Sequence, residues 1–187
     1  MSTPVRILAF AASARAASLN RKLLAATVDA VRAVGAEVTL IDLNDFTLPL
    51  YHGDLEDREG LPPAAAALIA QIQAHQGLLI ASPEYNGMIT PLLKNTIDWC
   101  TRGDDDPFPG KVAAVVSASP GAFGGMRSHQ LAQQLLLKLG CHVVPAVTTL
   151  AQADKAFDAD GHLTDARAQK SVKALATSLV ALTRSVG

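Results

Sequence analysis

The chain has 187 residues, of which 49% are hydrophobic and 18% charged, and its formal net charge is −1. This composition excludes intrinsic disorder and predicts one domain, over residues 1–187, with a substantial buried core. The near-neutral charge and an aromatic content of 4% argue against binding to nucleic acid or to an anionic membrane surface.

Apolar strands alternate with amphipathic helices along the chain. The pattern predicts strands over residues 5–11, 37–42, 77–82, 111–117 and 141–147. It predicts helices over about 19–34, 63–76, 91–102, 124–139 and 164–184, and it leaves the acidic stretch 54–59 in a long connection. Strands without polar alternation are typical of a parallel sheet that is covered on both faces. We therefore predict an α/β protein with one doubly wound parallel sheet.

The turn after the first strand, residues 11–20, combines small residues with polar ones. Ser13, Arg15, Ser18 and Asn20 provide hydroxyl, guanidinium and amide groups at the start of a helix, where backbone N–H groups and the helix dipole also attract anions. The turn lacks the Gly-Lys-Ser/Thr of a P-loop and the G-x-G-x-x-G of a dinucleotide site, so we expect it to bind a compact monophosphate. The alternative is an ordinary turn in which Ser18 caps the helix.

Two further turns carry candidate ligand residues. Residues 83–87 read Pro-Glu-Tyr-Asn-Gly, a sequence that can place backbone polar groups along the edge of a flat heterocycle. The alternative is an ordinary turn before a helix that is capped by Thr90. Residues 117–125, which include Ser117 and Gly121, are small enough for a second ring edge to approach the backbone.

These three turns follow the first, third and fourth strands. In the flavodoxin-like strand order 2-1-3-4-5, the switch point lies between the first and third strands, with the fourth alongside. We therefore predict a flavodoxin-like three-layer sandwich, with helices on both faces of a five-stranded sheet. The three turns should line one crevice at the carboxyl ends of the strands.

In these turns the chain resembles the NAD(P)H-dependent FMN reductases of flavodoxin-like fold, and within them the bacterial quinone and chromate reductases. The resemblance rests on A-S-A-R-A-A-S-L-N-R-K-L at 12–23, L-P-L-Y at 48–51, P-E-Y-N-G at 83–87, L-K-N-T-I-D-W-C-T-R at 93–102 and S-A-S-P-G-A-F-G-G at 117–125. It implies these FMN-binding residues: Ser13, Arg15, Ser18, Leu19, Asn20, Pro83, Glu84, Tyr85, Asn86, Gly87, Ser117 and Gly121. The main departure is Ala12, where the family usually has Gly; a positive φ at this position would strain the loop.

The resemblance further implies an enzyme that transfers two electrons from NADPH or NADH through FMN to a small-molecule acceptor, such as a quinone, chromate or a flavin. It implies no catalytic side chain, because the cofactor carries the chemistry. It also implies a homodimer or homotetramer with the flavin site near the subunit boundary. The alternatives are a flavodoxin-type electron carrier, against which the near-neutral charge argues, and a flavin-binding sensor without turnover.

The remaining polar residues indicate no second site. The five histidines lack the paired spacing of a metal site, so we expect no metal. Arg102 and Arg127 could attract cofactor phosphates or form pairs across subunits. Cys100 and Cys141 are expected to be buried thiols, as in a reducing compartment. Since no stretch approaches the roughly 20 apolar residues of a membrane span, we expect a cytoplasmic protein with no membrane partner.

Overall fold

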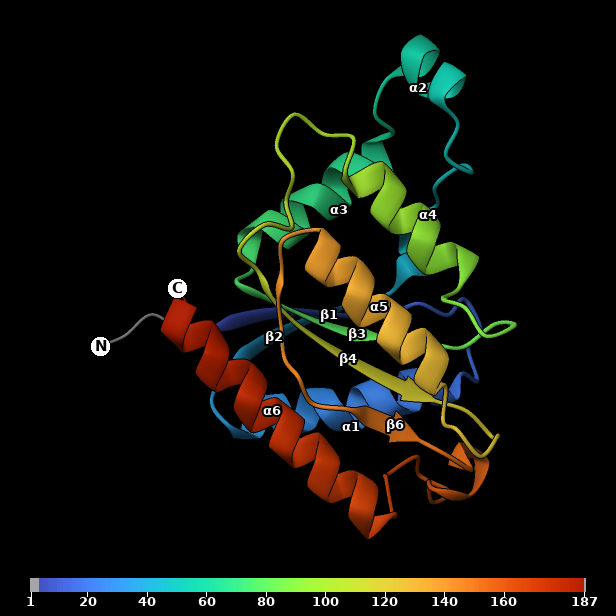
Figure 1. Ribbon diagram of the computed structural model, residues 1–187, viewed down its shortest axis with the longest axis vertical. Helices are drawn as coiled ribbons and strands as arrows, with labels where there is room; N and C mark the ends of the chain where they lie inside the picture. The colour runs from blue at the N-terminus through green and yellow to red at the C-terminus, as the bar shows by residue number, and fades with distance from the viewer. Residues whose placement is uncertain (1–3, 187) are drawn as a thin grey trace.

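The computed structural model describes residues 4–186 as a central sheet between two layers of helices (Figure 1). The strands are β1 (Arg6–Ala11), β2 (Glu37–Ile41), β3 (Gly77–Ala81), β4 (Val112–Ala118), β5 (His142–Val143) and β6 (Thr148–Leu150). The helices are α1 (Leu19–Ala33), α2 (Gly53–Glu59), α3 (Pro63–Ala74), α4 (Pro91–Cys100), α5 (Met126–Lys138) and α6 (Ala166–Val186), with short 3-10 helices η1 (Leu43–Asp45) and η2 (Ala153–Lys155). The strands run parallel in the order β2-β1-β3-β4-β5, which confirms the predicted flavodoxin-like fold.

The sheet divides the core into two layers. Along β1, Ile7 and Ala9 pack in the layer beneath α1 and α6, whereas Leu8 and Phe10 pack beneath α3, α4 and α5. Successive side chains of a strand point to opposite faces, so a strand covered on both sides must be apolar throughout. Within residues 4–186, no helix combines the length and apolarity needed to cross a membrane.

The prediction of one continuous fifth strand over 141–147 is wrong. The structure has two short segments, β5 and β6, and both pair with β4. From His142 to Thr148 the chain advances six positions, while the paired residues of β4, Val112 and Val116, are four apart. The two extra residues bulge out around Pro145, which has no N–H to donate to a ladder.

Side chains of α5 replace the missing strand partners at this bulge. His129 donates from Nε2 to the Val115 carbonyl oxygen at 3.0 Å, and Gln133 donates from Nε2 to the Val144 carbonyl oxygen at 3.2 Å. His129 is fully buried, and burial lowers its pKa, which favours the neutral ring. The interrupted edge is therefore stabilised from the helical layer.

Helix α2 was not predicted, because it buries none of its residues and so has no apolar periodicity. Figure 1 shows it standing apart from the other helices. Tyr51 connects it to the body: its hydroxyl donates to the Glu56 carboxylate at 2.9 Å, and its ring meets that of Trp99 edge-on at 5.2 Å. Trp99 is fully buried and donates to the Pro49 carbonyl oxygen, so it is a core residue of the chain.

Candidate functional site

The turns after β1, β3 and β4 line one cleft of about 330 Å³ at the carboxyl ends of these strands. Eight of the predicted residues line it: Ser13, Arg15, Ser18, Leu19, Asn20, Pro83, Glu84 and Tyr85. Strand β3 lies between β1 and β4, so three turns that are far apart in sequence become neighbours. The structure thus brings together the main part of the predicted site.

Ser18 is the N-cap residue of α1, but its hydroxyl makes no capping hydrogen bond. It is buried and lines the cleft. Because the first N–H groups of a helix have no partners within the helix, those of α1 remain available to a ligand. This geometry favours anion binding over the ordinary capping role.

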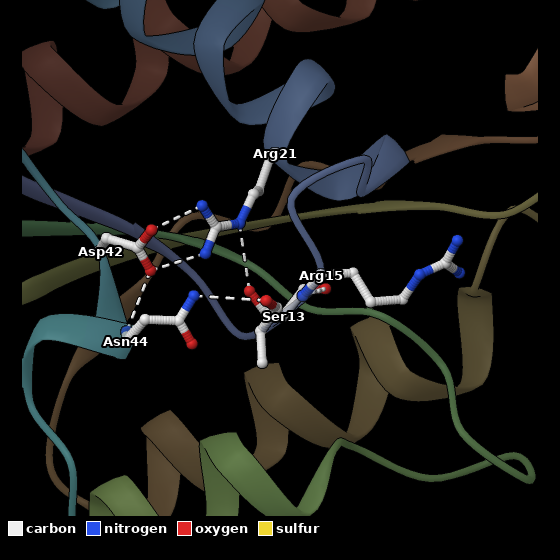
Figure 2. Close-up of polar contacts among 6 residues, drawn as sticks. Ser13, Arg15, Arg21, Asp42 and Asn44 are labelled. Atoms are coloured by element: carbon white, nitrogen blue, oxygen red, sulfur yellow. Dashed lines mark hydrogen bonds and ion pairs between the residues drawn. The ribbon is translucent and has the colours of Figure 1, made fainter.

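Arg15 is the cation of this turn. Its side chain is exposed and lines the cleft, and Figure 2 shows it extending away from the pair formed by Arg21 and Asp42. The backbone N–H of Arg15 donates to the Ser13 hydroxyl at 3.4 Å, which tightens the turn. A guanidinium on this side of the turn can approach a phosphate in the cleft.

A clamp behind the turn was not predicted (Figure 2). Arg21 donates to both carboxylate oxygens of Asp42 at 2.6 Å, and its Nε donates to the Ser13 carbonyl oxygen at 3.1 Å. Asn44 donates from Nδ2 to the Ala14 carbonyl oxygen at 3.2 Å. These bonds occupy two carbonyl oxygens that would otherwise repel an anion. The hydrogen bond from Arg21 also holds the pKa of Asp42 below its usual 3.8.

Asn20 joins the first turn to the third. Its Nδ2 donates to the Ala118 carbonyl oxygen at 2.8 Å, and its Oδ1 accepts the Ala118 N–H at 2.9 Å. Asn20 is buried, so these bonds satisfy backbone groups that water reaches poorly. The side chain holds two walls of the cleft together, and one amide hydrogen remains for a ligand.

Ala12 occupies the position where the resembled family usually has Gly. Among the described residues, only Asn86 and Gln152 combine a positive φ with a side chain, so the methyl group of Ala12 causes no backbone strain. Ala12 donates its N–H to the Ala81 carbonyl oxygen at 2.8 Å, and its own carbonyl oxygen accepts the Thr90 hydroxyl at 2.9 Å. The departure from the family pattern is sterically harmless.

Residues 85–88 form a tight hairpin at the cleft. Tyr85 and Met88 exchange two backbone hydrogen bonds of 3.0 Å. The two residues of the turn have positive φ angles, 54° for Asn86 and 78° for Gly87. Asn-Gly is the preferred sequence of such a type I′ turn, so these two residues are explained by the backbone alone. Neither lines the cleft, whereas Tyr85, 46% exposed, does.

Glu84 connects this hairpin to α5. Its carboxylate accepts the backbone N–H of Arg127 at 3.0 Å and pairs with the Arg127 guanidinium at 3.0 Å. Arg102 pairs with Glu56 at 3.2 Å. Arg102 and Arg127, whose role the sequence left undecided between binding cofactor phosphates and pairing across subunits, therefore both have partners within the chain.

The third turn is arranged differently from the prediction. Ser117 is fully buried beneath the cleft and donates to the Ser82 carbonyl oxygen at 2.8 Å, and a Cβ at Gly125 would collide with its hydroxyl. Gly121 is exposed and lies outside the cleft lining. The residues of this turn that line the cleft are Ala118, Ser119 and Pro120, and Asp154 of η2 joins them.

A doubly wound sheet whose polar turns meet in a cleft at its switch point defines a flavodoxin-like protein, the class of fold that binds phosphorylated planar cofactors at this place. Comparison with known families gives a closer assignment. The chain belongs to the NADPH-dependent FMN reductase family, whose model matches residues 5–155.

The sequences of named relatives match nearly the whole chain. An NAD(P)H-dependent FMN reductase of Pseudomonas aeruginosa is 37% identical over 175 residues, which are 92% of each protein. A probable NADPH:quinone oxidoreductase of Oryza sativa is 38% identical and covers 96% of this chain and 92% of its own length. Among solved structures, the flavoenzyme NAD(P)H:(acceptor) oxidoreductase FerB of Paracoccus denitrificans matches with a TM-score of 0.84 at 27% identity, over 98% of this chain and 99% of its own.

Proposed function

We propose that the chain works as a single FMN-binding domain that uses NADPH or NADH to reduce small electrophiles by two electrons, with quinones as the first acceptor class and chromate or free flavin as others. The observation that carries this proposal is the meeting of three turns at one cleft, where the Ser18 hydroxyl caps no N–H of α1 and where the Arg15 guanidinium forms no ion pair within residues 4–186. Family membership and the names of the relatives support it.

The residues of the cleft fit FMN. Arg15, the Ser18 hydroxyl and the first N–H groups of α1 would hold the phosphate, where positive charge and a helix start favour a dianion. Tyr85 and Pro120 also line the cleft and would border the ring system. Bound FMN supplies the hydride-accepting chemistry. The chain orients this cofactor, and no side chain is assigned a proton-transfer step.

The test is turnover by the FMN-loaded protein. We expect the purified protein to bind FMN and to oxidise NADPH with a benzoquinone acceptor far faster than the same concentration of free FMN. An electron carrier or a sensor would be yellow but would oxidise NADPH no faster than free FMN. A protein that binds no FMN would refute both the site and the function.

The assembly that we propose is a homodimer or homotetramer with the cleft near the subunit boundary. Leu50 is 80% exposed, and its neighbours are fixed: Asn95 donates to the Pro49 carbonyl oxygen at 2.9 Å and accepts the Tyr51 N–H at 2.8 Å. An apolar side chain held outward by an ordered segment beside the projecting α2 suits burial by a second copy. Sedimentation equilibrium should show an oligomer that Leu50→Asp weakens; a wild-type monomer at tens of micromolar would contradict it.

A further inference from the structure

A second groove, of about 720 Å³, lies beside the cleft. The two hollows share a wall: in the turn after β4, Pro120 lines the cleft and Phe123 the groove, and in η2 Asp154 lines the cleft and Lys155 the groove. The far side of the groove is the first part of α6. A ligand that is too long for the cleft can therefore continue over this wall into the groove.

The wall is held by backbone hydrogen bonds. Gln152 donates its N–H to the Gly121 carbonyl oxygen at 3.2 Å, and Ala153 donates to the Ser119 carbonyl oxygen at 3.1 Å. Gly124 packs so closely on Leu150 that a Cβ there would come within 2.7 Å of the Leu150 carbonyl carbon. The two hollows therefore have a fixed relative position.

The charged lining of the groove is suited to an anion. Lys155 and Arg167 both line it, and neither forms an ion pair within the described part of the chain. Among the described residues that line the groove, Asp165 is the one acidic residue. Its carboxylate accepts the N–H of Ala168 at 2.7 Å, at the start of α6. Two cations without carboxylate partners fit a phosphate dianion.

The groove also offers an aromatic face. Phe123 lines the groove and is 63% exposed; Arg127, whose guanidinium carbon lies 5.3 Å from the centre of this ring, does not line the groove. Exposed aromatic rings bind nucleobases by stacking. A nucleobase and a phosphate could therefore be bound in the same groove.

We propose that this groove binds the adenosine half of the reduced nicotinamide nucleotide, with Lys155 and Arg167 receiving the 2′-phosphate of NADPH. The proposal rests on the proposed function, since the nicotinamide half must reach the flavin in the neighbouring cleft. It assigns preference for NADPH over NADH to two residues that lie outside the flavin cleft.

The test is calorimetric titration of the FMN-loaded protein with adenosine 2′,5′-bisphosphate, with 5′-AMP and inorganic phosphate as comparison ligands. We expect the bisphosphate to bind about tenfold more tightly than 5′-AMP, and each of Lys155→Ala and Arg167→Ala to reduce this ratio by roughly three- to fivefold, as for partly exposed charge pairs. Lys173→Ala removes the same charge from α6 outside the groove lining and should leave the ratio unchanged.

Equal binding of the bisphosphate and 5′-AMP, or equal effects of the three substitutions, would overturn the inference. Inorganic phosphate that displaces the bisphosphate at a similar concentration would also overturn it, because the groove would then be a simple anion site. Steady-state kinetics keep the two proposals apart. A wild type that oxidises neither nucleotide refutes the proposed function, whereas active variants with an unchanged NADPH-to-NADH ratio of kcat/KM refute only the groove.

Discussion

Asn20 and Ala118 are 98 residues apart in sequence, yet the amide of one forms two hydrogen bonds with the backbone of the other, at 2.8 and 2.9 Å. These bonds bridge the turn after β1, which we propose receives the phosphate, and the turn after β4. Asn20, which the sequence predicts to contact the cofactor, therefore also holds two turns of the site together.

Asn20→Ala should therefore lower both stability and FMN affinity. The substitution leaves a buried N–H and a buried carbonyl oxygen without partners, which costs about 2–4 kcal/mol of unfolding free energy. Asn44→Ala is the control: Asn44 is exposed and donates a single 3.2 Å bond to the Ala14 carbonyl oxygen, so its removal should cost less than about 1 kcal/mol. Urea denaturation of the two variants without FMN measures the difference. Equal stabilities would contradict the bridging role.

Ser18 and Thr90 allow a paired test, because both are N-cap residues but only Thr90 uses its hydroxyl as a cap, accepting the Leu93 N–H at 3.2 Å. Thr90→Ala should cost at least about 1–2 kcal/mol of stability, because it removes both the cap and the hydrogen bond from the Thr90 hydroxyl to the Ala12 carbonyl oxygen. Ser18→Ala should change stability by less than about 0.5 kcal/mol but should raise the FMN dissociation constant roughly tenfold, the effect of one hydrogen bond to a charged group. Fluorescence titration with FMN and denaturant melts measure the two quantities. A stability loss without an affinity loss in Ser18→Ala would assign Ser18 to capping.

Asp42 should make stability fall in acid. Its pKa in the folded state is below the ordinary 3.8, chiefly because Arg21 donates to it. A carboxyl group with a depressed folded-state pKa stabilises the fold at pH above its unfolded pKa, and this contribution is lost as the pH falls through the folded value. Wild type should therefore lose stability relative to Asp42→Asn below about pH 4, while the difference between them is constant above about pH 5. Parallel thermal melts from pH 7 to pH 3 that give a constant difference would contradict the clamp.

The two cysteines should be unreactive in the folded protein. Burial raises the pKa of Cys100 to about 12 and that of Cys141 to about 12, so the reactive thiolate is scarce at neutral pH. Iodoacetamide at pH 8 should modify neither residue in the native protein and both after denaturation, as counted by intact-mass spectrometry. Rapid modification of either native thiol would show that its surroundings open.

The sequence could predict those parts of the site whose polar residues stand close together in one stretch of the chain. Ser13 to Asn20 and Pro83 to Tyr85 follow buried strands, and strand order alone brings them together. The Arg21–Asp42 clamp could not be predicted in this way, since a basic residue in a helix and an acidic residue after a strand are usually solvated. It exists because β2 lies beside β1 and α1 packs against both.

Ser117 shows a different limit. Its hydroxyl and its place near a Gly-rich turn suggested a ligand, but it is still part of β4, where its side chain is fully buried. Asp154 was missed for the opposite reason: nothing in its local sequence signals a site. It reaches the cleft because β6 pairs with the last residues of β4 and leads directly into η2.

The bulge around Pro145 therefore has a consequence beyond the sheet edge. By giving the chain a second pairing with β4, it brings Asp154 to the cleft and Lys155 to the neighbouring groove, from a segment separate from the turn after β1. Under the proposed function, substitutions in this segment would change which molecules reach the flavin and would leave the proposed phosphate-binding turn unchanged. Proteins of this fold can therefore change which reactants they bind and keep the way they bind the cofactor.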